Sequence, residues 1–298
     1  MVTLDVGETI VGKWNGNKYT IIKKLGHGGT GHVYLVEDAK NRKKYAMKIS
    51  DDSISLNREY NLLRRFSYIN IVVRVYEQDD IYIGSEQLNF ILLEYIQGKT
   101  LKELTYRKVD INIALGIIII ILEGLKKFHG EGYILGDLKL ENIMVDRGHH
   151  NLRIIDLGGV VEEGGTIKEF TPAYDRASWK CGERRSEGSY DIFTVNMVLI
   201  RLLLDQEIDP RKNDINYIMN KIRLMGINEK VQVYILNILR GKSYSVENLK
   251  KGFIKIYKEE ERNKAKIRND KRDRRINFML AVSCISFVLV TVFIYYNL

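Results

Sequence analysis

The sequence predicts an α+β protein with strands in its amino-terminal part, helices later in the chain and a single membrane-spanning helix near its carboxy terminus. Residues 19–49 alternate between apolar and polar side chains, as strands do. Residues 114–122 form an apolar run that is too short to cross a bilayer and is typical of a buried helix. Residues 278–296 carry no charge, and as a helix they would rise about 28 Å, close to the thickness of a membrane core.

The composition is that of an ordinary globular chain. Its 298 residues suffice for one two-lobed domain or for two small domains. Cys181 and Cys284 are the only cysteines and lie far apart, which argues against a disulfide framework and fits a reducing compartment. The first twelve residues include acids and no apolar core, so we do not predict a secretory signal there.

A basic juxtamembrane segment, residues 258–275, precedes the predicted membrane helix and short tail, residues 276–298. Residues 262–275 hold eight lysines and arginines against Asp270 and Asp273. By the positive-inside rule, this charge predicts a single-pass protein of the cell membrane whose preceding residues stay in the cytoplasm. The charge should also attract anionic lipid headgroups. We predict no nucleic-acid partner, because no recognition motif accompanies the charge.

Two further possibilities concern the charge-free segment. It could be a buried carboxy-terminal helix of a soluble domain, although such helices seldom lack a polar face. Its small residues could also pack one span against a second copy of the chain, which leaves a homodimer open. These small residues are Ala281, Ser283 and Ser286.

A glycine-rich turn joins two predicted strands near the amino terminus. Gly26, Gly28 and Gly31 form a G-x-G-x-x-G pattern that dinucleotide-binding folds also use. In those folds the glycines open a helix, whereas here they precede the strand-like run 33–36 and then Lys48. Because glycine lets backbone N–H groups approach closely, such a turn can fold over phosphates. The alternative is an ordinary β-hairpin with a surface lysine.

Two acids, a lysine and an asparagine follow at the spacing that a phosphoryl-transfer site needs. Asp137 can orient a hydroxyl nucleophile, and Lys139 can neutralise charge on the moving phosphoryl group. Asn142 and Asp156 can hold Mg²⁺ through oxygen ligands. Either acid alone would more often be a turn or cap residue. Together with Lys48, in this order, the set makes coincidence negligible.

The D-x-K-x-x-N sequence at 137–142 and the D-x-G sequence at 156–158 resemble the catalytic and metal-binding motifs of protein kinases. The glycine-rich turn and the A-x-K sequence at 46–48 resemble the amino-terminal lobe of the same family. Lys139 is similar to the residue that serine/threonine kinases have at this position. The chain therefore resembles the eukaryotic-like serine/threonine protein kinases of bacteria.

The resemblance covers about residues 19–257 and implies a bilobal kinase domain over residues 1–257. It implies a β-rich N-lobe over about residues 1–96 and a helical C-lobe over about residues 97–257. ATP and Mg²⁺ are the cofactors that it implies, and the substrate would be a protein. It also implies that the catalytic residues are Lys48, Asp137, Lys139 and Asn142, and that the metal ligands are Asn142 and Asp156.

The family also implies how the nucleotide would be held. Val33 would cover the adenine, and Lys48 would reach the α- and β-phosphates while Glu59 holds it in place. A surface ion pair of Glu59 with Arg58 or Arg65 is the alternative. The implied nucleotide-binding residues are Leu25, Gly26, Gly28, Gly31, Val33, Ala46, Lys48, Glu59, Leu93, Glu94 and Ile96.

Residues 90–101 resemble the strand and hinge that join the two lobes of a kinase. Leu93 would be the gatekeeper, and the backbone of Glu94 and Ile96 would bond to the adenine edge. In the C-lobe, the resemblance assigns Thr171 a bridge to two catalytic residues. It assigns Asp191 the anchoring of the catalytic-loop backbone.

The chain departs from the kinase pattern in the residues that normally support regulation. Leu135-Gly136 stands where the family has His-Arg, which implies a non-RD kinase whose activation segment needs no phosphorylation. Ala177-Ser178-Trp179 replaces Ala-Pro-Glu, and Ser243 replaces the arginine that pairs with that glutamate. Losing both partners of a buried ion pair can be nearly neutral. We expect Trp179 to fill the resulting space.

These residues predict transfer of the γ-phosphate of MgATP to serine and threonine hydroxyls of cytoplasmic proteins. A membrane-anchored pseudokinase scaffold is one alternative, which the altered sequence at 177–179 motivates. A kinase-like phosphotransferase that acts on small molecules is another. The sequence at 171–174, which resembles a peptide-substrate lip, weighs weakly against the second alternative.

Overall fold

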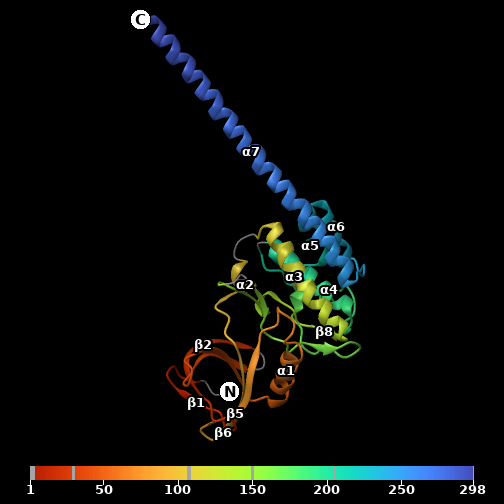
Figure 1. Ribbon diagram of the computed structural model, residues 1–298. Coiled ribbons are helices and arrows are strands. Elements are labelled where there is room, and N and C mark those ends of the chain that lie inside the picture. The colour runs from red at the N-terminus through yellow and green to blue at the C-terminus, as the bar shows by residue number, and fades with distance from the viewer. Residues whose placement is uncertain (1–3, 29–30, 106–108, 149–150, 205, 298) are drawn as a thin grey trace.

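The computed structural model describes residues 4–28, 31–105, 109–148, 151–204 and 206–297; the solvent exposure of Gly28 and the side chains of residues 276–278 and 280–297 lie outside this description. Figure 1 shows a strand-rich lobe that holds the amino terminus, a helical lobe above it and a long helix that projects away from both. The α+β, two-lobed architecture is the one that the sequence predicts.

The amino-terminal lobe is a six-stranded antiparallel sheet in the order β1-β2-β3-β4-β6-β5. Its strands are β1 (Thr9–Val11), β2 (Lys18–Gly28), β3 (Gly31–Asp38), β4 (Lys44–Ser50), β5 (Val75–Ile83) and β6 (Glu86–Glu94). The alternating run 19–49 thus forms β2, β3 and β4. Large side chains that alternate along these strands, such as Tyr19, Tyr34, Met47 and Phe90, fill the lobe's own core.

Helix α1 (Ser53–Arg65) packs against β5 and β6. The side chain of Asp52 caps it by accepting a hydrogen bond from the Ser55 amide at 3.0 Å. Leu56, Glu59 and Leu63 are buried on the helix, and their spacing of three and four residues puts them on one face. The apolar face of α1 therefore carries a carboxylate into the interior.

The carboxy-terminal lobe is mainly helical. Its helices are α2 (Leu101–Leu104), α3 (Ile111–Gly130), α4 (Gly188–Leu203), α5 (Ile215–Leu224), α6 (Glu229–Leu239) and the start of α7 (Val246–Asn297). Its short strands are β7 (Gly98–Thr100), β8 (Tyr133–Ile134), β9 (Ile143–Asp146), β10 (Leu152–Ile154) and β11 (Val161–Glu162). The apolar run 114–122 lies inside α3, where Ala114, Ile118 and Leu122 are fully buried, so the prediction of a buried helix is confirmed.

Helix α7 packs along α3 and then leaves the lobe as one continuous helix (Figure 1). Lys250 Nζ lies 2.7 Å from Glu123 Oε2, and Lys264 Nζ lies 2.8 Å from Asp110 Oδ1. The basic side chains of residues 262–275 are all exposed.

No helix is long and apolar enough to cross a membrane among the residues that the structure describes. The predicted span, residues 278–296, follows the backbone of α7, but apart from Met279 its side chains lie outside the described residues. The membrane helix therefore stays a prediction.

Candidate active site

A buried ion pair joins β4 to α1. Lys48 Nζ lies 2.6 Å from Glu59 Oε2, and the two residues are only 5 % and 2 % exposed. Asp156 Oδ2 lies 3.7 Å from the same nitrogen. The contact that the sequence predicts between Lys48 and Glu59 is present. The alternative prediction, a surface ion pair of Glu59 with Arg58 or Arg65, is wrong. Arg58 donates to the carbonyl of Gly158, and Arg65 donates to Glu131.

The environment of this pair changes the acidity of both groups. Burial is the main cause that raises the pKa of the Glu59 carboxyl, and the negative charge of Asp156 raises it further. Lys48 lowers this pKa, but the net result is a pKa of about 7. Burial lowers the pKa of the Lys48 ammonium, but Asp156 and Glu59 together raise it above its ordinary value. Lys48 therefore stays charged at neutral pH, while Glu59 titrates near neutral pH.

We expect kcat/KM for ATP to rise with pH through about pH 7, because Glu59 must be ionised to hold Lys48 firmly. A pH profile from about pH 6 to about pH 8 checks this, and Glu59→Gln should be less active and lack the inflection. A wild-type profile that is flat through pH 7 would contradict it. The stability of the fold should change with pH in the opposite direction to the activity. The pKa of Glu59 in the folded protein exceeds its ordinary value of 4.5, so protonated Glu59 favours the folded state. This contribution to the free energy of unfolding is full below pH 4.5 and is lost as pH rises through about 7.

The catalytic loop brings Asp137, Lys139 and Thr171 into direct contact. Asp137 Oδ1 accepts a hydrogen bond from Thr171 Oγ1 at 2.8 Å, and its Oδ2 accepts one from Lys139 Nζ at 2.5 Å. Lys139 Nζ also donates to Thr171 Oγ1 at 3.2 Å. The bridge by Thr171 that the sequence predicts is therefore present, and it ties the catalytic loop to the later segment.

Asp191 at the start of α4 fixes the backbone of this loop. Its Oδ2 accepts from the Leu135 amide at 2.8 Å and its Oδ1 from the Gly136 amide at 3.1 Å, and the residue is 1 % exposed. His129 Nε2 lies 2.8 Å from the same carboxylate. The anchoring predicted for Asp191 is thus present, while the contribution of His129 was missed, because a lone histidine at a helix end carries no sequence signal.

Gly136 adopts a backbone conformation that only glycine takes easily. Its φ is +73°, and a Cβ added there would lie 2.4 Å from the carbonyl oxygen of Gly159. A Cβ on Gly159 would in turn lie 2.7 Å from the Cβ of Asp137. The catalytic loop and the segment after Asp156 therefore touch backbone to backbone.

The candidate nucleotide-binding residues lie in register across neighbouring strands. Val33 on β3 pairs with Lys48 on β4, and Ala46 on β4 pairs with Leu93 on β6. Gly26 on β2 pairs with Val33. Because alternate residues of a strand share a face, Ala46 and Lys48 lie on the same side of the sheet.

The glycine turn brings two backbones close together. A Cβ on Gly31 would lie 2.2 Å from the carbonyl oxygen of Ile49, so this position needs glycine. Gly28 is the last residue of β2, and the tip of the turn, Gly29 and Thr30, lies outside the described residues.

The predicted hinge follows the end of β6. Glu94 is the last residue of that strand, and its amide donates to the carbonyl of Arg74 at 2.8 Å. Ile96 comes two residues later and is 7 % exposed, while Leu25 on β2 is 40 % exposed. The roles of these residues in nucleotide binding stay predictions.

The oxygen atoms around Asp156 fit Mg²⁺ and a nucleotide. Asp156 Oδ1 accepts from the Gly158 amide at 2.7 Å, and its side chain is 36 % exposed. Asn142 Nδ2 donates to the Asp137 carbonyl at 3.3 Å, which leaves its Oδ1 as an acceptor for a metal. A carboxylate and an amide oxygen beside a buried lysine match the way Mg²⁺ is usually bound with nucleotide phosphates.

Trp179 does not fill the space that the sequence analysis assigned to it. It is 3 % exposed, and its Nε1 donates to the carbonyl of Ala173 at 3.0 Å. A cavity of about 700 Å³ remains beside Ser243, and Arg176 lines it whereas Trp179 does not. The expectation is therefore not met, because the indole is hydrogen-bonded to Ala173, within residues 171–174, instead.

A buried carboxylate in the same segment was also missed. Asp175 is fully buried and accepts from Arg184 Nη2 at 2.6 Å, Ser178 Oγ at 2.6 Å and Tyr190 Oη at 2.9 Å. Burial opposes its ionisation, but these hydrogen bonds hold the pKa of Asp175 below its ordinary value. This network, rather than the family's glutamate–arginine pair, stabilises the end of the segment.

The two lobes, with a buried lysine between sheet and helix and a carboxylate–lysine–threonine contact below it, define an enzyme of the phosphoryl-transferring class. Residues 19–267 match the family model described as the protein kinase domain. The chain therefore belongs to the protein kinase family.

Individual relatives agree with this assignment. The serine/threonine-protein kinase YabT of Bacillus subtilis is 36 % identical over 257 residues, which cover 85 % of this chain and 75 % of that protein. The serine/threonine-protein kinase PrkC of the same organism is 27 % identical over 214 residues, which cover 65 % of this chain and 31 % of that protein. The structure of vaccinia related kinase 3 shares the fold with a TM-score of 0.67 at 13 % identity, covering 87 % of this chain and 92 % of that one. The chain is a protein-serine/threonine kinase.

Proposed function

We propose that the chain transfers the γ-phosphate of MgATP to serine and threonine hydroxyls of cytoplasmic proteins, as a non-RD kinase. The contact among Asp137, Lys139 and Thr171 carries this proposal. It holds a carboxylate and an ammonium side by side, and this pair could bind the hydroxyl group of an acceptor. The position of the usual arginine is Gly136, so the loop has no cation there to bind a phosphorylated segment.

The residues act mainly by positioning and by charge. Asp137 orients the acceptor hydroxyl and takes its proton, and Lys139 neutralises charge that develops beside it. Lys48, held by Glu59, contacts the phosphates of the bound nucleotide. Asn142 and Asp156 would hold Mg²⁺, which neutralises the phosphate oxygens when it is bound.

Transfer of label from γ-labelled ATP to protein tests this proposal. We expect wild type to label serine and threonine in a protein fraction, and Asp137→Ala to be slower by about 10²- to 10⁴-fold. Wild type that transfers no more than Asp137→Ala would favour the pseudokinase scaffold. Wild type that consumes ATP only when a sugar or an aminoglycoside replaces protein would favour a small-molecule kinase.

We also propose that residues 278–296 anchor the kinase in the cell membrane, with the kinase domain in the cytoplasm. The charge-free sequence and the exposed basic residues before it support this, since such a pair is typical of a membrane helix and its cytoplasmic flank. The full chain should stay with membranes after an alkaline carbonate wash, and a chain that ends at Arg275 should not. Recovery of the full chain in the soluble fraction would contradict the anchor.

A further inference from the structure

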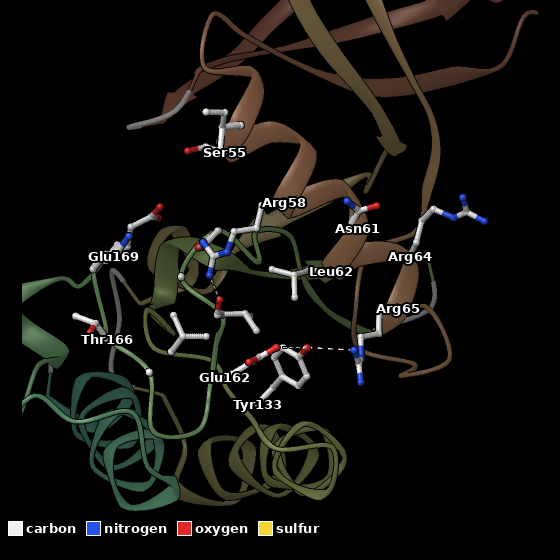
Figure 2. Close-up of a pocket in the computed structure, with 17 residues that line it drawn as sticks. Ser55, Arg58, Asn61, Leu62, Arg64, Arg65, Tyr133, Glu162, Thr166 and Glu169 are labelled. Carbon is white, nitrogen blue, oxygen red and sulfur yellow. Dashed lines mark hydrogen bonds between the residues drawn. The ribbon is translucent and has the colours of Figure 1, made fainter.

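An arginine of α1 reaches the segment that follows Asp156. Arg58 Nη1 donates to the carbonyl of Gly158 at 2.9 Å, and Nη2 donates to the carbonyl of Val160. These acceptors lie about 100 residues further along the chain. Figure 2 shows the side chain pointing from α1 toward this segment, with a hydrogen bond drawn between them. Arg58 thus joins an element of the N-lobe to the metal-binding segment of the C-lobe.

The segment is held from its other side by the catalytic loop. Gly159 packs so closely on Asp137 that a Cβ has no room between them. Strand β11, which continues the segment, pairs with β8, which leads into the catalytic loop. The Gly158 amide donates to Asp156 Oδ1. A shift of this segment would therefore move Asp156 relative to Asp137.

Packing between α1 and this segment is incomplete: Leu62 and Val160 are buried in one apolar cluster, but an opening lies beside them. A cavity of about 1240 Å³ lies between the helix and the segment, lined by Ser55, Arg58 and Leu62 from α1 and by Gly158, Val160 and Thr166 from the segment (Figure 2). Such an opening reduces the side-chain contacts that would otherwise fix two neighbouring elements. Arg58 lines this cavity and adds two directional hydrogen bonds between the two elements.

Arg58 is followed directly by the residue that holds the active-site lysine. Glu59 lies 2.6 Å from Lys48, so consecutive residues of α1 reach two different parts of the site. We propose that Arg58 is a positioning residue that ties the Asp156 segment to α1 and orders the Mg²⁺ site without a phosphate on the segment. This inference rests on the MgATP site proposed above.

The expected effect follows from the strength of such bonds. Arg58 lies on the exposed face of the helix, so its two charge-assisted bonds contribute modestly rather than at the level of a buried pair. Their loss should lower kcat by about fivefold to tenfold. It should raise the Mg²⁺ concentration for half-maximal activity by a similar factor, because fewer molecules hold Asp156 in place.

The test compares Arg58→Met with wild type and with Arg64→Met in the full chain. Arg64 lines the same cavity but stacks on Tyr60 of its own helix, so it is the matched control. Arg58→Lys keeps the charge and one donor, and it should be intermediate. The measurements are kcat against Mg²⁺ concentration, the affinity for ADP without Mg²⁺, and the melting temperature.

The inference predicts a raised Mg²⁺ midpoint and a lowered kcat for Arg58→Met, with unchanged Mg²⁺-free ADP affinity and with Arg64→Met like wild type. An Mg²⁺ midpoint equal to that of wild type would overturn it, including where the melting temperature falls. If Arg58→Met fails to fold, the midpoint of Arg58→Lys decides instead. Wild type without Mg²⁺-dependent activity would be a failure of the proposed function, which is a different result.

Discussion

Replacing both members of the buried pair, as Lys48→Met with Glu59→Leu, should strongly reduce phosphate transfer without unfolding the protein. The two side chains are 7 % and 2 % exposed, so the desolvation of both charges offsets most of their attraction. Apolar side chains of similar volume are often neutral at such sites or stabilise the fold by about 1–4 kcal/mol. Activity should fall by about 10²-fold or more, because the phosphates lose their preorganised cation.

The single variants separate stability from function. Lys48→Met leaves Glu59 buried without its cation, so this variant should be less stable than the double variant and equally inactive. Urea unfolding gives the free energies, and transfer from labelled ATP gives the rates. A double variant that is less stable than either single variant would show that the ion pair stabilises the fold, contrary to this expectation.

The grouping of the candidate catalytic residues could be predicted from the sequence, because phosphoryl transfer demands particular side chains at short, fixed spacings. Asp137, Lys139 and Asn142 lie on one loop, and the later segment supplies Asp156. The partner of Lys48 was implied by the resemblance to kinases, and Glu59 is the only acid in α1. The strands of the sheet and the buried helix α3 could also be predicted from the sequence. The apolar residues of each segment recur with the side-chain periodicity of the strand or helix that it forms.

Contacts that the resemblance to kinases did not imply could not be predicted in the same way. The acceptors of Arg58 are backbone carbonyls, which every sequence has, so no residue type marks them. Asp175 pairs with Arg184 within an irregular segment, where no periodicity indicates which side chains face inward. Trp179 was assigned to a space by analogy with the family, yet the backbone before it carries its indole toward Ala173 instead.

Gly136 shows how a departure from the family can be a requirement of this chain. In the sequence it marks only the absence of an arginine. In the structure its φ of +73° and its contact with Gly159 both need a residue without a Cβ. At the position where the family has arginine, the catalytic loop thus lies directly against the segment after Asp156. A residue with a Cβ at this position would collide with the carbonyl oxygen of Gly159.

Gly136→Ala should therefore lower activity far more than stability. The left-handed backbone alone costs about 1–2 kcal/mol for alanine, but the new Cβ must also push Gly159 or Asp137 out of place. Since misplacement by about 1 Å can cost about 10²-fold in rate, kcat should fall by that order. Gly132→Ala is the matched control, because Gly132 has a φ of +76° with no atom within 4 Å of its added Cβ. It should lose similar stability and keep kcat, whereas equal losses of kcat in both variants would mean that backbone strain, not the contact with Gly159, is what matters at Gly136.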